Sequence, residues 1–171
     1  MTIQSAVDIL NRFVPDPTQG LPEELFRFAS AIVPMVNVDL LIQNDQGQTL
    51  LTWREDEFFP PGWHIPGGII RYKETAHDRI RAVAAKELGA AVRSSETPIA
   101  FNEIIMEPSW RIRGHFISLL YRCELLESPA APESVNMNSP RSGEWAWHYG
   151  CPERLYKSQE FYRKFILHDR M

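Results

Sequence analysis

One stretch of the sequence combines residue types that can bind a cation and a phosphate. It begins with the pair Gly67 and Gly68 and continues into a predicted helix over 75–88 that contains Glu87. Adjacent glycines can adopt positive φ angles and leave their backbone carbonyls and amides accessible. Helical periodicity places Glu87 near the middle of the apolar stripe of the helix. A carboxylate on that side requires an arginine, a metal ion or several hydrogen bonds, so Glu87 and the glycine loop form a candidate cation and phosphate site.

Two glutamates of this stretch each have two interpretations. Glu87 could bind a metal ion or form a structural ion pair with Arg79 or Arg54, and the glycine pair that precedes it favours the metal. Glu74 lies at the junction between the loop and the helix. It could contact a metal, or it could bond the free amides of the first helical turn.

Basic residues and a histidine alternate along a predicted strand over 111–125. Arg111, Arg113 and His115 would share one face of this strand. Arginines can bind a diphosphate through paired hydrogen bonds, so the face is either a substrate-binding surface or a solvated sheet edge. His115 is either a general base or a structural histidine.

Four aromatic side chains are candidates for stacking on a nucleobase, although tryptophan is more often part of a core. They are Trp63, Tyr72, Trp145 and Trp147. We favour Trp63 because it lies next to the Pro-Gly-Gly run at 66–68.

The composition excludes several classes of protein. A chain of 171 residues, of which 44% are hydrophobic, can form one domain with a full core. Its net charge of −4 gives no general basic surface for nucleic acid. No apolar run reaches the roughly 20 residues that span a bilayer, and the N-terminus does not have the pattern of a secretory signal. Cys123 and Cys151 are expected to stay as thiols. We therefore expect a cytoplasmic protein with no nucleic-acid or membrane partner.

Apolar periodicity and turn residues predict a mixture of helices and strands. The predicted helices cover 4–13, 21–33, 75–88 and 158–167. The predicted strands cover 35–43, 48–53, 99–107, 111–125 and 144–149, and a long irregular loop covers 128–143. Because the order lacks a regular β-α-β alternation, we expect an α/β protein of the α+β kind, with a mixed sheet flanked by helices.

The stretch around Glu87 resembles the signature of the Nudix hydrolase family. The matching positions are Gly68, Glu74, Glu87 and Gly89, together with the approach Trp63, Pro66 and Gly67. The resemblance implies an α-β-α sandwich with a mixed sheet between helices. It also implies a single Nudix domain over 1–171, with an extra N-terminal helical segment at about 1–33.

Three positions depart from that signature. Ala82, Val83 and Lys86 stand where the family has an Arg and two Glu residues. Glu87 is therefore the one carboxylate left on the metal-binding face of the predicted helix. This argues against cleavage of a pyrophosphate by several metal ions.

The closest resemblance is to the GDP-mannose mannosyl hydrolases, a branch of the family with a reduced signature, and covers roughly residues 22–150. It depends on Asn37-Val38-Asp39, the turn at 44–47, Leu50-Leu51, Arg54, Glu87-Leu88-Gly89 and His115. The branch implies a homodimer that holds one Mg²⁺, or Mn²⁺, on the diphosphate of a nucleotide sugar while water attacks the sugar carbon.

Carried over by position, the resemblance assigns roles to particular residues. The Gly67 carbonyl and Glu87 would bind the metal, with Glu74 as a further candidate ligand. Arg54 and Asp39 would stabilise charge and contact the sugar. Trp63, Arg71, Arg111 and Arg113 are candidates for substrate binding.

The general base of that branch has no direct counterpart. Ser142 stands where the branch has its histidine, Arg141 where it has a glutamine ligand, and Ile69 where it has an arginine. His115, Glu144 and Glu133 are the nearby substitutes.

Three functions remain open. The first is a Mg²⁺-dependent hydrolase of a nucleoside diphosphate linked to a sugar. The second is a nucleotide-binding module with little or no catalysis, and the third is an ordinary pyrophosphohydrolase that cleaves at phosphorus.

Overall fold

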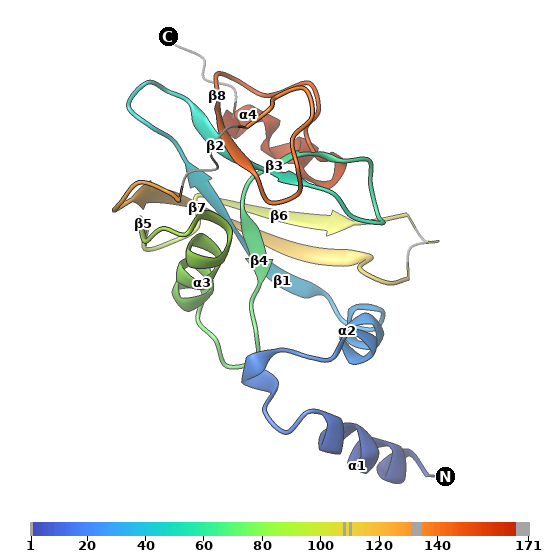
Figure 1. Cartoon of the computed structure of the whole chain (residues 1–171). Helices are drawn as coiled ribbons and strands as arrows, with labels where there is room; N and C mark the ends of the chain where they lie inside the picture. Colours follow the sequence, from blue (N-terminus) through green and yellow to red (C-terminus); the bar gives the residue numbers. More distant parts are fainter. Residues whose placement is uncertain (1, 108, 110, 131–134, 167–171) are drawn as a thin grey trace.

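A computed structural model describes residues 2–107, 109, 111–130 and 135–166 (Figure 1). Its helices are α1 (Ile3–Phe13), α2 (Glu23–Ser30), α3 (Ala76–Leu88) and α4 (Arg163–Ile166), with the 3₁₀ helices η1 (Pro17–Gln19) and η2 (Lys157–Tyr162). Its strands are β1 (Met35–Ile42), β2 (Thr49–Arg54), β3 (Gly62–His64), β4 (Gly67–Ile69), β5 (Val92–Ser94), β6 (Ala100–Ile105), β7 (His115–Leu125) and β8 (Trp145–His148).

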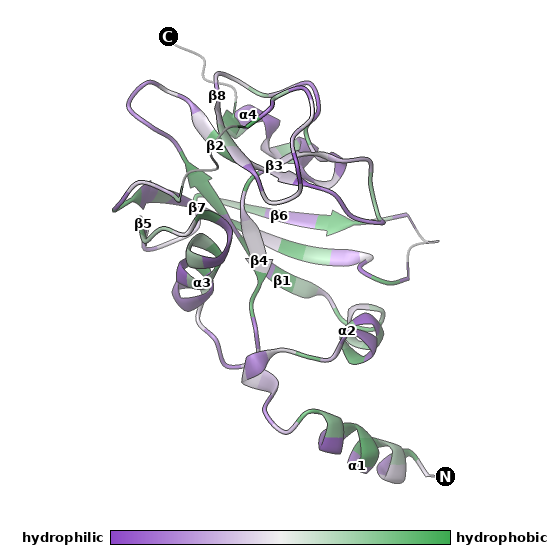
Figure 2. Ribbon diagram, in the orientation of Figure 1, coloured by the Kyte–Doolittle hydropathy of each residue, from purple (hydrophilic) through white to green (hydrophobic). Residues whose placement is uncertain are grey.

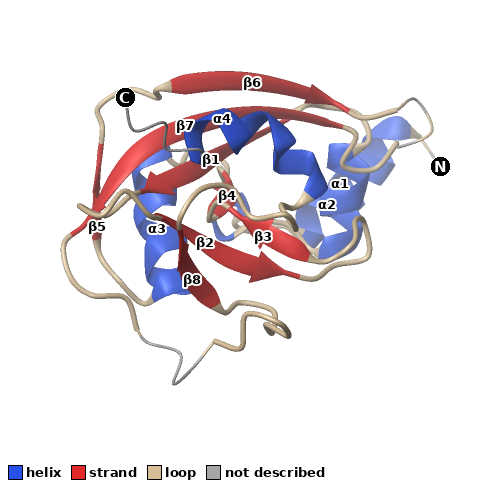
Figure 3. Cartoon of the chain, turned by 90° about the horizontal axis from the view of Figure 1, so that it is seen from above, coloured by secondary structure: helices blue, strands red, loops and turns tan. Residues whose placement is uncertain are grey.

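The strands form two sheets (Figure 3), and α3 and α4 pack against opposite faces of β1. The larger sheet has the order β4-β1-β7-β5, with β6 also paired to β7, and the smaller has the order β3-β2-β8. The β1–β7 pair is parallel and the other pairs are antiparallel. The expected mixed α/β class with helices around a mixed sheet is confirmed, although the strands divide into two sheets.

Strand β1 separates two apolar cores. Val38, Leu40 and Ile42 pack with α3, whereas Leu41 packs with η2 and α4. Successive side chains of a strand point to opposite faces, so Asp39 shares the direction of Leu41 and faces η2. The alternation therefore places a carboxylate beside the second core.

Helix α3 begins and ends at specific capping residues. The Thr75 hydroxyl accepts a hydrogen bond from the Asp78 amide at 3.1 Å. At the other end Gly89 adopts the left-handed conformation with φ of 61°, which glycine tolerates best. Gly68 lies directly against this helix, because a Cβ at that position would be 2.8 Å from Cγ2 of Val83. The glycine pair thus allows β4 to pack closely between β1 and α3.

Several predicted elements differ from the structure. Strand β7 begins at His115, so the predicted strand over 111–125 is too long. The C-terminal helix predicted over 158–167 is η2 followed by the short α4, and residue 167 lies outside the described part of the chain. The strands β3, β4 and β5 were not predicted, because three residues carry almost no period-two signal.

The N-terminal helix α1 lies apart from the sheets and has no buried residue (Figures 1 and 2). Its apolar side chains are exposed, with Ile3 at 86% and Phe13 at 67% of their full exposure. Across the described residues, the helices are all too short or too polar to cross a bilayer.

Candidate active site

A cleft of about 1100 Å³ gathers most of the candidate residues. Its lining residues come from η1, α2, α3, η2 and both sheets. This cleft is lined by several residues singled out in the sequence, among them Asp39, Arg54, Gly67, Arg71, Tyr72, Glu87 and Arg113.

Glu87 lies in the last turn of α3 and has few partners. Its Oε2 accepts one long hydrogen bond, of 3.4 Å, from the Thr52 hydroxyl. Burial raises the pKa of its carboxyl group from 4.5 to about 7, and the nearby charges of Arg54 and Lys86 oppose this shift only in part. Within the described residues Glu87 makes no ion pair. The alternative of a structural pair is not what the structure shows, since Arg79 pairs with a different carboxylate, that of Glu74.

The carbonyl of Gly67 is a second group available to a ligand. Gly67 stands opposite Asp39 in the antiparallel β1–β4 pair. The neighbouring pair is hydrogen-bonded, because the Leu40 amide donates to the Pro66 carbonyl at 2.9 Å. Antiparallel pairs alternate, so Gly67 and Asp39 form a non-hydrogen-bonded pair and the Gly67 carbonyl points away from β1. Because β4 is an edge strand, this carbonyl is free to face a ligand.

Asp39 differs from Glu87 in being surrounded by hydrogen-bond donors. The donors are the Tyr162 hydroxyl at 2.6 Å, the Asn37 amide at 2.9 Å, the Gln159 amide at 3.5 Å and the Ser118 hydroxyl. Asp39 is 3% exposed, and its burial raises the pKa of the carboxyl group to about 6 against the effect of these donors.

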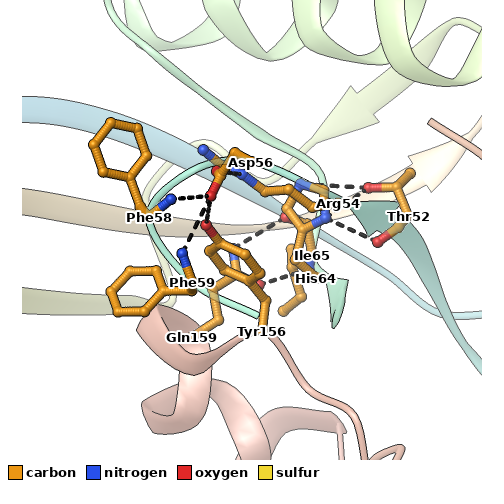
Figure 4. A network of polar contacts seen from close by, with 9 residues as sticks. All are labelled: Thr52, Arg54, Asp56, Phe58, Phe59, His64, Ile65, Tyr156 and Gln159. Carbon is orange, nitrogen blue, oxygen red and sulfur yellow. Dashed lines mark hydrogen bonds and ion pairs between the residues drawn. The ribbon is translucent and has the colours of Figure 1, made fainter. Parts of the chain in front are cut away.

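Arg54 is held at the end of β2 by a polar network (Figure 4). Its Nε donates to Asp56 Oδ2 at 2.6 Å, and its guanidinium lies 4.9 Å from the ring centre of Tyr156. The Tyr156 hydroxyl in turn donates to Asp56 at 2.5 Å. The charge of Arg54 lowers the pKa values of both Asp39 and Glu87, so it acts on the two carboxylates of the cleft.

His64 also lines the cleft and was missed in the sequence. Its Nδ1 lies 2.8 Å from the Thr52 carbonyl oxygen, which can only accept, so Nδ1 carries the proton (Figure 4). Burial lowers the pKa of His64 to about 4, so the ring is neutral near pH 7. Its position next to Trp63 and the glycine pair was the available signal. No local pattern indicated Gln159 or Tyr162, which reach Asp39 from the C-terminal part of the chain.

Several predicted residues do not line the large cleft. Trp63 is 4% exposed and belongs to the core, with its ring 5.3 Å from Trp53. His115 Nε2 lies 3.3 Å from Glu103 on the β6–β7 pair. Glu144 pairs with Arg141 at 2.8 Å, and hydrogen bonds from Arg141 lower the pKa of its carboxyl group.

Glu74 and Arg111 are two further predicted residues that do not line the large cleft. Glu74 nevertheless accepts a hydrogen bond from the backbone amide of Arg71 at 2.8 Å and pairs with Arg79 at 2.7 Å, and both arginines line the cleft. Arg111 is exposed in the connection before β7. The expectation that Arg111, Arg113 and His115 share a strand face is wrong, because Arg113 has a positive φ of 52° before the strand begins. Residue 133, the third candidate base, lies outside the described residues.

A smaller cavity of about 590 Å³ borders the large cleft. Lys86, Glu87 and Ser142 line both spaces, whereas Glu144 and Arg141 line only the smaller one. Glu87 therefore stands where the two cavities meet.

The cleft is richer in basic than in acidic side chains, although the whole chain has a net charge of −4. The basic residues that line it are Arg54, Arg71, Arg79, Lys86 and Arg113, and the acidic ones are Glu23, Asp39 and Glu87. The raised pKa values of Asp39 and Glu87 reduce the negative charge further. The arrangement favours an anionic ligand.

The residues present fit one hard divalent cation rather than a cluster of cations. The described residues contain no group of three His, Cys, Asp or Glu that could hold a metal ion. Glu87 and the Gly67 carbonyl nevertheless supply two oxygen donors, and Mg²⁺ commonly completes its shell with waters and substrate phosphates.

Comparison with known proteins agrees with this fold. The family model described as NUDIX domain matches residues 33–149, which is more than half of the chain. The chain therefore belongs to the NUDIX family.

Two solved structures share the fold. A MutT NUDIX hydrolase from Burkholderia pseudomallei has a TM-score of 0.59 at 19% identity, over 77% of this chain and 97% of that chain. A possible asymmetric diadenosine tetraphosphate hydrolase from Jonesia denitrificans has a TM-score of 0.52 at 22% identity, over 68% of this chain and 77% of that chain. At these identities the likeness concerns the fold alone.

One curated relative is similar in sequence. The low-salt glycan biosynthesis protein Agl8 of Haloferax volcanii is 40% identical over 76 residues, which are 44% of this chain and 48% of that protein. The match thus spans about half the length of the relative.

Proposed function

We propose that this protein is a Mg²⁺-dependent hydrolase that acts on a nucleoside diphosphate linked to a sugar. The observation that carries the proposal is the position of Glu87, a carboxylate with one long hydrogen bond in a predominantly basic cleft. A cation there would favour the ionised carboxylate, and the basic side chains would favour a diphosphate. The name of the similar protein Agl8 refers to glycan biosynthesis, which supports a nucleotide sugar such as GDP-mannose as the substrate.

The proposed roles follow from the placement of the residues. Glu87 and the Gly67 carbonyl would hold Mg²⁺ or Mn²⁺, which supplies charge neutralisation for a departing diphosphate. Arg54, fixed by Asp56 and Tyr156, would add positive charge on the same side. Asp39, fixed by its donors, would orient the sugar.

The general base is proposed from two candidates outside the large cleft. Glu144 is the better placed, because it lines the smaller cavity together with Glu87. His115, the first residue of β7, remains the second candidate, although its ring lies beside Glu103 of β6.

A binding module without efficient catalysis is the second candidate function. It is favoured by the lack of a three-residue metal cluster among the described residues and by Lys86 beside Glu87. Such a module would bind the nucleotide sugar in the same cleft without turnover.

The test is incubation with a panel of nucleotide sugars and Mg²⁺, comparing wild type, Glu87→Gln and the exposed control Glu96→Gln. We expect free sugar and nucleoside diphosphate from the wild type and the control, and little product from Glu87→Gln. Sugar phosphate and mononucleotide would show cleavage at phosphorus, and tight binding without product would show a binding module. Equal turnover by wild type and Glu87→Gln would contradict the proposed site.

We also propose that the chain acts in the cytoplasm as a homodimer on a small-molecule substrate. The net charge of −4 supports a small ligand over nucleic acid. Sedimentation velocity of the full chain tests the assembly, and a monomer at all concentrations would contradict it.

A further inference from the structure

Three segments that are distant in sequence meet around the side chain of Arg113. Its guanidinium carbon lies 4.9 Å from the ring centre of Phe26 on α2 and 4.9 Å from that of Phe58 in the loop after β2. All three residues line the large cleft. The N-terminal helical segment therefore forms a wall of the cleft, and Arg113 joins this wall to the larger sheet.

The backbone fixes the position of Arg113. Its φ of 52° lies in the left-handed region, which a residue with a side chain rarely adopts. Its amide donates to the Ser30 hydroxyl at the end of α2, at 3.2 Å. Strained backbone persists only where the surroundings hold it, and it is concentrated at ligand sites.

Arg113 has no anionic partner within the described part of the chain. Its Nε is buried and makes no hydrogen bond there. The two nearest carboxylates are engaged elsewhere, because Glu23 lies 3.8 Å from Arg27 and Asp56 pairs with Arg54 at 2.6 Å. A partly buried cation without a partner is unfavourable, and contact with aromatic rings offsets this only in part.

The Arg113 wall lies apart from the proposed metal site. The charges that act on Glu87 are those of Arg54, Lys86 and Asp39, whereas Arg113 is affected by Arg54, Glu23 and Asp56. The charge of Arg54 acts on both groups. Figures 1 and 3 agree, because α2 and α3 lie on opposite sides of β4.

Chemistry at this wall favours an anion. Ring contacts occupy the flat surface of a guanidinium and leave its N–H groups pointing outward from the edge, where they match the paired oxygens of a carboxylate or phosphate. Arg71 also lines the cleft, beside Gly20 of the N-terminal segment, where a Cβ on Gly20 would be 3.7 Å from the Arg71 Nε.

We propose that Arg113, on the wall formed by α2, is a subsite for a second anionic group of the substrate, separate from the diphosphate held beside Glu87. This inference rests on the proposed function for the class of ligand. The second anion is a carboxylate on the sugar or a phosphate on the ribose. Arg113 thus determines specificity, and the N-terminal helical segment positions it.

This proposal is tested by measuring binding and not turnover. The result is therefore independent of whether the protein hydrolyses the ligand. Titration calorimetry with Mg²⁺ measures Kd for three ligands with one nucleobase: a nucleoside diphosphate hexose, the matching hexuronate, and the hexose with a ribose phosphate. We expect one acidic ligand to bind the wild type about 10- to 100-fold more tightly than the neutral one, as for one charge-assisted pair. Preference for the hexuronate identifies the carboxylate, and preference for the third ligand identifies the phosphate.

Two variants test whether Arg113 causes the preference for an acidic ligand. Arg113→Gln is expected to remove this preference by weakening binding of the acidic ligand at least about tenfold more than binding of the neutral hexose, and the control Arg111→Gln is expected to retain it. If Arg113→Gln does not fold in a thermal scan, Arg113→Lys replaces it and is expected to lose most of the preference, because an ammonium lacks the paired donors. Equal Kd values for all three ligands, or equal weakening of all three by the Arg113 variant, would overturn the proposal.

Discussion

Two carboxylates that line the same cleft, those of Asp39 and Glu87, differ greatly in the number of hydrogen bonds they accept. Asp39 on β1 receives hydrogen bonds from Tyr162, Asn37, Gln159 and Ser118. Glu87 on α3 receives one long hydrogen bond from Thr52. Burial raises the pKa of both groups, to about 6 for Asp39 and about 7 for Glu87.

This difference in hydrogen bonding distinguishes a structural carboxylate from one that is available to a ligand. A buried carboxylate with several donors connects the elements that supply them, and here Asp39 connects β1 and β7 to η2. A carboxylate with almost no donors destabilises the empty protein and is stabilised by whatever cation binds it. We therefore expect changes at Asp39 to act mainly on folding and changes at Glu87 mainly on ligand binding.

The largest expected effect is on the stability of Asp39→Ala. Removing the carboxylate leaves four buried donors without their acceptor, so the free energy of unfolding should fall by about 3–5 kcal/mol. Urea denaturation measures the loss. The exposed Asp45→Ala should change the free energy by less than about 0.5 kcal/mol. A loss no larger than that of the control would break the comparison.

A smaller effect is expected for Tyr162→Phe, which keeps the ring and removes one donor. The Tyr162 hydroxyl lies 2.6 Å from Asp39 and 2.8 Å from the Ser118 hydroxyl. Its loss should lower the free energy of unfolding by about 1–2 kcal/mol. The melting temperature of Tyr162→Phe is compared with that of the matched control Tyr149→Phe, which changes a tyrosine that is 72% exposed. Equal melting temperatures for the two variants would show that the network contributes little.

An effect of the opposite sign is expected for the stability of Glu87→Gln. Burial raises the folded-state pKa of Glu87 from 4.5 to about 7, so the folded protein holds a proton that the unfolded chain has released over this range. The resulting stability is fully present below pH 4.5 and is lost as the pH rises through 7. In the absence of metal, Glu87→Gln should match the wild type in free energy of unfolding near pH 4.5 and exceed it by up to about 3 kcal/mol at pH 8.

Denaturation of both proteins in a chelator at the two pH values checks this sign. Mg²⁺ added at pH 8 should stabilise the wild type and not the variant. A variant less stable than the wild type at pH 8 without metal would place Glu87 with Asp39 as a structural group.

Regular helices were predictable from the sequence because their signals are local. The helix predicted over 4–13 is α1 (Ile3–Phe13), and that over 75–88 is α3 (Ala76–Leu88). In α3 an apolar stripe and a glycine at the C-terminal end point to the same boundaries. The short strands β3 and β4 lack such signals, and the glycines of β4 argue against a strand until its pairing with β1 is known.

The candidate site could be predicted where its residues are local or match the pattern of the family, as Asp39 and Arg54 do. Gly67 and Glu87 belong to one stretch of sequence, and both line the cleft. Three of the four donors to Asp39 come from β7 and η2, about 80 to 120 residues further along the chain, and only the fold brings them together. Arg113 was expected on a strand face, whereas its role depends on a left-handed residue and on Phe26 from α2.

The most direct test of the central claim is a titration of Mn²⁺ into the full chain with a nucleoside diphosphate present, observed by electron paramagnetic resonance. The wild type and the exposed control Asp45→Asn should bind one cation per chain. Glu87→Gln should bind it at least about tenfold more weakly, because it loses the one charged oxygen ligand. Unchanged affinity in Glu87→Gln, or two or more cations bound per wild-type chain, would contradict the account.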